Sequence, residues 1–131
     1  MTSISAGLLI YDVLANDAGV TSITSRIFPV VSEKDSPLPY ICYRRASNET
    51  TAAKNIPGAN ACIVELACYA ATYAGSIKLA EAVRNALDGI QAEFTDGTDR
   101  LVARSIQLMD SEEGWADDAY FQTLTFAIRI N

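Results

Sequence analysis

Residues 61–90 constrain the fold of this 131-residue chain more than any other segment. Apolar side chains first alternate with period two, which is typical of a strand with one buried face. These positions are Cys62, Val64, Leu66 and Cys68. Apolar residues then recur every three or four positions, which predicts an amphipathic helix. These positions are Ile77, Ala80, Val83, Leu87 and Ile90. With a turn at 74–76 between them, the segment predicts a strand that leads directly into a helix over the same core.

Both ends of this helix carry residues that favour helix termination. Ser76 has a hydroxyl that can accept from a backbone N–H of the first turn, so we predict that it is the N-cap. Gly89 adopts the left-handed conformation without steric cost, and we predict that it follows the last helical turn.

The remaining elements follow from the same patterns. An apolar face predicts a helix over residues 3–16, and β-rich composition predicts strands over 23–31 and 40–46. Pro29 cannot donate to a sheet ladder, so the first strand is an edge strand or ends there. Alternation predicts two further strands over 100–110 and 120–130, joined by a short acidic connection at 111–118.

Residues 47–60 have little apolar content and a Pro–Gly pair, so we predict a flexible loop there. The element order is then α-β-β-β-α-β-β over one domain, residues 1–131. A mostly antiparallel sheet of about five strands with two helices packed on one face is the economical arrangement. The sequence therefore predicts the α+β class.

Composition narrows the range of functions. Ten Lys and Arg residues against sixteen Asp and Glu give a net charge of −6, which disfavours sequence-independent DNA binding. The apolar runs are far shorter than the roughly 20 residues of a membrane-spanning helix. The chain has no histidine, no CxxC motif and no glycine-rich phosphate loop. We therefore expect neither an enzyme nor a bound cofactor or metal.

The three cysteines lie in apolar, strand-like segments: Cys42, Cys62 and Cys68. Cys62 and Cys68 are six residues apart on one strand, roughly 20 Å when extended, which is too far for a disulfide. We expect buried free thiols in a reducing compartment.

One cluster of ionisable residues leaves a catalytic interpretation open. Five carboxylates fall within nine residues: Asp110, Glu112, Glu113, Asp117 and Asp118. They could hold Mg²⁺ or Ca²⁺ or act as an acid–base pair, which would make the chain a small metal-dependent hydrolase. Alternatively, they belong to a solvated hairpin connection that they keep soluble.

Several residues are candidates for contacts with a partner. Arg44 and Arg45 alternate across their strand, so only one of them faces solvent on the open side of the sheet, where it contacts a partner or forms an intramolecular ion pair. Trp115 is either an interface anchor or a cover for one end of the core. The complete set of candidate interface residues is Arg44, Arg45, Asn48, Lys54, Asn55, Glu112, Glu113 and Trp115.

Two segments resemble small proteins of long-tailed phages. RIFPVVSEKDSPLPYICYRRAS, residues 26–47, has an arginine–hydrophobic–proline strand, a polar loop and a Leu-Pro-Tyr entry into the next strand. VELACYAATYAGSIKLAEAVRNALDGI, residues 64–90, has a strand ending in Thr-Tyr and a helix ending in Ala-Val-Arg-x-Ala-Leu-Asp-Gly. With the final strand–acidic turn–strand unit, these motifs resemble the tail completion proteins, also called tail terminator or tail-to-head joining proteins. Residues 47–60 carry no matching motif.

The resemblance implies a structural virion protein. Its subunits form a ring, typically a hexamer, that ends the tail tube and joins it to the head-side connector. The implied partners are further copies of the chain, the tail tube protein and the head-side connector protein, with DNA passing through the ring without sequence-specific binding. The implied location is the head–tail junction of the virion, after assembly in the bacterial cytoplasm. A head-closure or connector ring of the same machinery is the alternative.

Overall fold

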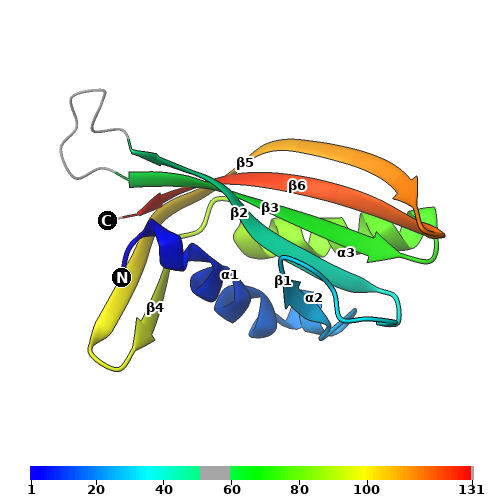
Figure 1. Ribbon diagram of the computed structural model, residues 1–131, viewed down its shortest axis with the longest axis horizontal. Helices are drawn as coiled ribbons and strands as arrows, with labels where there is room; N and C mark the ends of the chain where they lie inside the picture. Colours follow the sequence, from blue (N-terminus) through cyan, green and yellow to red (C-terminus); the bar gives the residue numbers. More distant parts are fainter. Residues whose placement is uncertain (51–59, 131) are drawn as a thin grey trace.

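The computed structural model describes residues 1–50 and 60–130, with the backbone alone described for 47–50 and 60. It is an α+β fold in which helices cover one face of a six-stranded sheet (Figure 1). The elements in chain order are η1 (Ser3–Ser5), α1 (Ala6–Ala15), α2 (Ala18–Thr21), β1 (Ile27–Pro29), β2 (Tyr40–Thr50), β3 (Asn60–Ala70), α3 (Tyr73–Leu87), β4 (Ala92–Asp96), β5 (Asp99–Ala116) and β6 (Ala119–Ile130).

The strands lie side by side in the order β1-β2-β3-β6-β5-β4. β1 and β2 are parallel, and every other neighbouring pair is antiparallel. The predicted α+β class and mostly antiparallel sheet are confirmed. The predicted strand number of five is wrong, because β4 forms a hairpin with the start of β5 through a turn at Gly97. β4 is only five residues long, and its alternation is limited to Ala92 and Phe94, so the period-two pattern is short.

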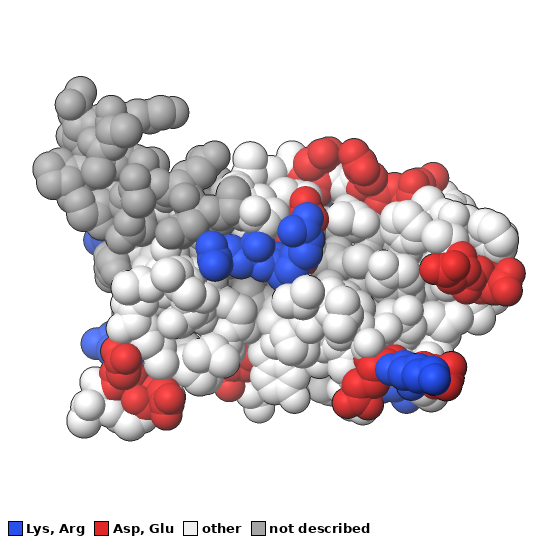
Figure 2. All heavy atoms as spheres, in the orientation of Figure 1, with Lys and Arg blue, Asp and Glu red and all other residues white. Residues whose placement is uncertain are grey.

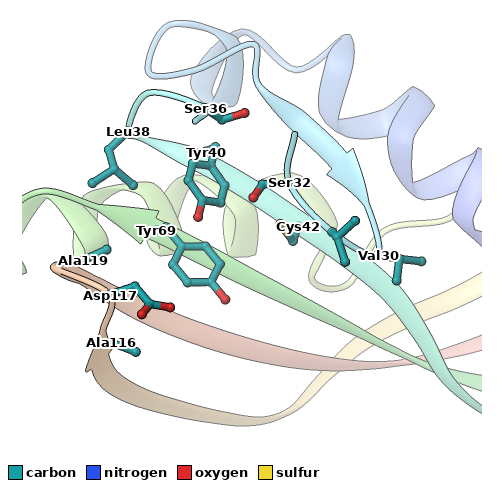
Figure 3. Close-up of a pocket in the computed structure, with 11 residues that line it drawn as sticks. Val30, Ser32, Ser36, Leu38, Tyr40, Cys42, Tyr69, Ala116, Asp117 and Ala119 are labelled. Carbon is teal, nitrogen blue, oxygen red and sulfur yellow. The ribbon is translucent and has the colours of Figure 1, made fainter. Parts of the chain in front are cut away.

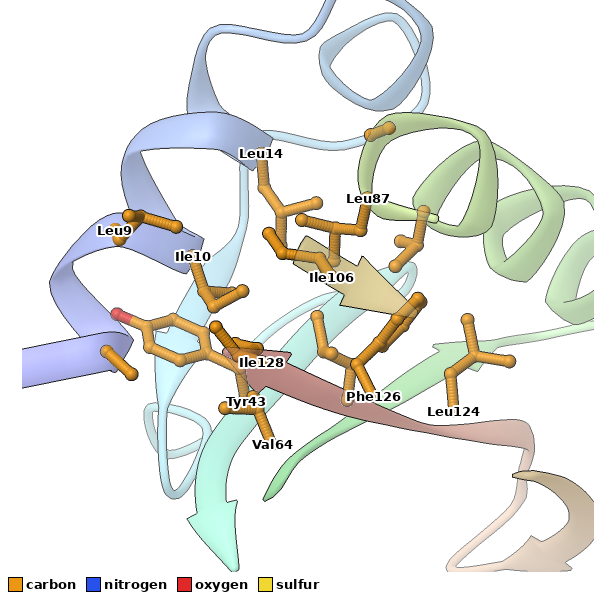
Figure 4. Packing of buried hydrophobic residues seen from close by; sticks show 14 of the residues in the cluster. Leu9, Ile10, Leu14, Tyr43, Val64, Leu87, Ile106, Leu124, Phe126 and Ile128 are labelled. Carbon is orange, nitrogen blue, oxygen red and sulfur yellow. The ribbon is translucent and has the colours of Figure 1, made fainter. Parts of the chain in front are cut away.

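The centre of the sheet is the pairing of β3 with β6. It runs without a bulge from Asn60 opposite Ile130 to Ala70 opposite Tyr120. Alternate residues of both strands face the helices and are buried, as the alternation predicted. Figure 4 shows side chains of α1 and α3 meeting those of the strands in one apolar cluster. Its largest fully buried side chain is Phe126 of β6.

Helix α3 begins earlier than predicted. Its N-cap is Thr72, whose hydroxyl accepts from the Gly75 N–H at 3.0 Å. Ser76, the predicted N-cap, is instead buried inside the first turn and donates to the Tyr73 carbonyl at 2.7 Å. Thr72 and Ser76 both have a hydroxyl that can cap a helix. Because β3 already ends at Ala70, the helix begins after Thr72, the earlier of the two. Gly89 has φ of +80° just after the helix, as predicted.

The predicted acidic connection at 111–118 is wrong. β5 continues through it to Ala116, and only Asp117 and Asp118 form the turn into β6. Register shifts between Ala103 and Ser105 and between Leu108 and Asp110 interrupt the alternation. Each extra residue reverses which side chains face the core. The sequence of β5 therefore lacks the continuous alternation that predicts a single strand.

The other predicted bounds also change. The N-terminal helix is divided into η1 and α1, and the short α2 follows it. The strand expected at 23–31 contracts to β1, which ends at Pro29 on the edge of the sheet. Of the loop expected at 47–60, β2 includes the residues up to Thr50 and β3 begins at Asn60. The remainder, 51–59, lies outside the described residues.

All three cysteines are free thiols, as predicted, with Cys62 and Cys68 buried and Cys42 half-buried. None of the helices in the described part of the chain is both long and apolar enough to cross a bilayer.

Truncating the largest buried side chain should show how far stability depends on the central pair of strands. Phe126→Ala removes a fully buried ring from the middle of β6, and we expect it to lower the free energy of unfolding by about 3–5 kcal/mol. Urea denaturation followed by circular dichroism measures this. Val31→Ala, at an exposed position, is the control and should change stability by less than about 0.5 kcal/mol. Equal losses in the two variants would contradict the assignment of the core.

Candidate assembly surface

The predicted arginine pair lies on β2, with one side chain on each face of the sheet. Arg44 is on the face without helices, where its guanidinium forms an ion pair with Glu65 of β3 at 2.7 Å. Arg45 is on the helix side, opposite Val64, and both arginines are exposed. The Arg44–Glu65 pair is solvent-accessible, so it contributes at most about 1 kcal/mol to stability.

The predicted residues of β5 lie at the far end of the sheet, next to the turn into β6. Glu112 is opposite Thr123 on the face without helices, whereas Glu113 is opposite Gln122 on the helix side. Trp115 is also on β5, and 59% of its surface is exposed. It therefore does not close one end of the core.

Glu113 is tied to helix α3 by hydrogen bonds. Its carboxylate accepts from the Tyr73 hydroxyl at 2.8 Å and from the Gln122 amide at 3.2 Å. These donors stabilise the charged carboxylate, so the pKa of Glu113 is lowered. The same bond to Glu113 raises the pKa of Tyr73, because the neutral phenol is the donor. Sequence patterns did not indicate this contact between residues 40 positions apart.

The remaining candidates are only partly placed. Asn48 belongs to β2, but its side chain is outside the described residues, and so are Lys54 and Asn55. The fold groups the arginines on β2 and the acids and tryptophan on β5, with β3 and β6 in between. Three strand spacings separate the two groups by about 14 Å. In the view of Figure 2, which has the orientation of Figure 1, basic side chains gather near the centre of the visible surface and acidic ones lie along its upper border.

The carboxylate cluster does not form a metal centre. Strand alternation turns Glu112 and Glu113 to opposite faces, and Asp117 and Asp118 lie in the turn. Among the described residues, no group of three or more metal-ligating side chains comes together. The extension of β5 beyond residue 110, which the sequence patterns did not predict, thus separates residues that are close in sequence.

A row of aromatic rings crosses the face without helices. Phe28, Tyr40, Tyr69 and Phe121 come from four adjacent strands, with successive ring centroids 6.0, 4.9 and 5.6 Å apart. The row continues to Gly114 on β5, where an added Cβ would be only 2.5 Å from the Phe121 ring. The residues were visible in the sequence, but their alignment depends on the register of four strands.

A groove of about 440 Å³ lies beside this row. Figure 3 shows the Tyr40 and Tyr69 rings between the loop that follows β1 and the turn that joins β5 to β6. The loop is held in place by Arg26, whose guanidinium donates to the carbonyls of Pro37 at 2.8 Å and Pro39 at 3.2 Å.

The cysteine in this groove is not an activated nucleophile. The titratable side chains of the groove include the Cys42 thiol, and burial raises the pKa of that thiol. A protonated thiol is a poor nucleophile. Burial also raises the pKa of the neighbouring Cys68 to about 12.

The N-terminal helical segment carries an exposed apolar stripe. Ile4, Leu8 and Tyr11 are spaced four and three residues apart, so they share one side of η1–α1. The opposite side, with Leu9 and Leu14, is buried in the core. The apolar face of residues 3–16 predicted a helix, but it did not distinguish the three exposed residues from the buried ones.

The fold is similar to that of solved proteins. It aligns with a chain of the virion of a native gene transfer agent particle, with a TM-score of 0.69 and 18% identity, over 98% of each chain. A second solved protein aligns with a TM-score of 0.66 and 9% identity, over 100% of this chain and 96% of its own. No curated protein sequence and no protein-family profile matches. At these identities, the likeness is one of fold.

The hydrogen bond between Tyr73 and Glu113 gives a testable pKa prediction. Tyr73→Phe removes one of the two side-chain donors to Glu113, so we expect the pKa of Glu113 to rise. Because the folded pKa of Glu113 is below its unfolded value, the bond stabilises the fold at neutral pH, and this contribution is lost as pH falls through the folded pKa. Carboxyl-detected NMR titration measures the shift.

Tyr120→Phe is the matched control for this titration. Its ring lies edge-on to that of Tyr73 with centroids 5.9 Å apart, but the donor to Glu113 is the Tyr73 hydroxyl. The control should leave the pKa of Glu113 unchanged. The same shift in both variants would contradict the proposed donor.

Proposed function

We propose that this protein is a structural component of a phage or phage-like virion. The observation that carries the proposal is the similarity of fold to a chain of a gene transfer agent virion over 98% of both chains. The resemblance of residues 26–47 and 64–90 to tail completion proteins gives independent support from the sequence.

Within the virion, we propose the role of a ring subunit at the head–tail junction. The ring, most simply a hexamer, ends the tail tube and joins it to the head-side connector while DNA passes through. The exposed edges of the sheet, the exposed tryptophan and the exposed apolar stripe support a role in contacts with other chains. A net charge of −6 suits a channel wall that does not hold DNA phosphates.

Removing the gene from the virus or element that encodes it should separate the two proposed positions. A missing tail terminator leaves tube growth unchecked, so we expect over-long tubes and unjoined heads in electron micrographs. A missing head-closure ring would instead leave tails of normal length beside heads that have lost DNA. Supplying the wild-type gene in trans is the control and should restore complete particles. Normal particles without the gene would contradict a structural role in the virion.

A further inference from the structure

Beyond the short outermost strands β1 and β4, β2 and β5 each have a segment whose outer edge is open, and the two segments lie at opposite edges of the sheet. β1 pairs only with Ile41–Tyr43 of β2, so no strand in the described part of the chain covers residues 44–50 on that side. β4 pairs only with residues 99–103 of β5.

The next part of β5 is covered by the segment between α3 and β4. Ile106 exchanges backbone hydrogen bonds with Gly89 (2.7 Å) and Ile90 (3.2 Å), and the Asp88 carboxylate accepts from the Leu108 N–H at 2.9 Å. Beyond this point, residues 109–116 have β6 on one side and no described strand on the other. Open edges of seven and eight residues, about 23 and 26 Å long, offer their backbone groups to another strand.

The two open edges differ in net charge: residues 44–50 include two arginines and Glu49, whereas residues 109–116 include Asp110, Glu112 and Glu113 and no base. The β2 edge has Arg44 on the face without helices and Arg45 on the helix side. The β5 edge has Glu112 on the face without helices and Glu113 on the helix side. In the antiparallel register that places Arg45 opposite Glu113, Glu112 lies diagonally across from Arg44, so each arginine has an acid on its own face. Two identical edges would instead bring like charges together, which disfavours a symmetric contact between the same edges.

Each edge also has exposed apolar side chains. Tyr11 of the exposed stripe lies against Tyr43 of β2, with ring centroids 6.3 Å apart, so Ile4, Leu8 and Tyr11 run beside the β2 edge on the helix side. On β5, Trp115 is on the helix side, opposite Tyr120. An aromatic side chain and an apolar stripe on the same side of two complementary edges can form the desolvated centre of an interface.

Strand direction agrees with a head-to-tail contact. β2, β3, β6 and β5 are successively antiparallel, so β5 runs opposite to β2. Two copies in the same orientation therefore place β5 of one antiparallel to β2 of the next. In Figure 1, the open part of β2 lies at the left end of the sheet and that of β5 at the right end. Neighbouring copies are thus shifted along the strands, which inclines the strands to the axis of a closed ring.

We propose that the occupant of each open edge is a second copy of this chain. Residues 44–50 of one protomer pair with residues 109–114 of the next, with Arg45 opposite Glu113 and Arg44 diagonal to Glu112, and Trp115 packs on the Ile4–Leu8–Tyr11 stripe. The contact is heterologous, so each protomer keeps one edge of each kind for its two neighbours. This inference deepens the proposed function and rests on it for the closure of the ring.

Variants that disable one edge at a time test the contact. The basic-edge variant is Leu8→Gln with Arg45→Gln, and the acidic-edge variant is Glu112→Gln with Trp115→Gln; all four positions are exposed, and the neutral replacements give the two disabled edges no charge complementarity. Purified full-length protein is followed by sedimentation velocity and native mass spectrometry at low salt over a range of concentrations. We expect wild-type protein to form oligomers larger than dimers and each variant to associate at least about tenfold more weakly.

The decisive sample is an equimolar mixture of the two variants. Each variant keeps the edge that the other has lost, so the mixture should form heterodimers and nothing larger. The control, Lys78→Glu with Glu81→Lys, exchanges charges on the exposed side of α3 and should associate like wild type. Wild-type protein that stays monomeric throughout, variants that still oligomerise alone, or a mixture that stays monomeric would overturn the proposal.

These outcomes are separate from the test of the proposed function. Self-association through the two edges with normal particles in the absence of the gene would leave the contact standing and remove the virion role. Particles that fail without the gene but are restored by both edge variants would leave the virion role standing and remove the contact.

Discussion

The rest of the structure depends on the pairing of β3 with β6. Eleven consecutive residue pairs join these strands without a bulge, and their buried residues form the floor on which α1 and α3 pack. A shift of one residue would turn Phe126 from the core to the face without helices, so burial itself determines the register. β2 and β5 then extend the sheet on either side, and the helices need to cover only one face.

In this arrangement, the strand edges that are open to contacts lie at the two margins of the sheet. β1 and β4 are too short to cover the strands beside them, so part of β2 and part of β5 remain open. The charges there are opposite in sign, and the exposed apolar residues lie on the same side at both edges. The pocket with the aromatic row contains a protonated thiol instead of an activated nucleophile. The open edges are therefore the part of the fold on which the proposed contact between copies rests.

Sequence patterns predicted much of the fold but only part of the candidate surface. Regular alternation in β3 and β6 and helical spacing in α3 were enough to place the core, and Gly89 was enough to end the helix. β4 was missed because only two of its five residues are apolar and its alternation is short, and β5 was cut short because two bulges reverse its alternation. Arg44, Glu112 and Trp115 were singled out by residue type, whereas their distribution over two separate edges was not visible.

Local patterns alone were sufficient for the α+β class, the antiparallel character of the sheet and the buried faces of its central strands, because periodicity and capping involve residues near one another in the chain. The tertiary structure decided which strand edges stay open, that Arg44 pairs with Glu65, and that Glu113 accepts from Tyr73. It also decided that Ile4, Leu8 and Tyr11 face outward. Each of these features depends on how segments distant in the sequence pack against one another, and local patterns do not contain that information.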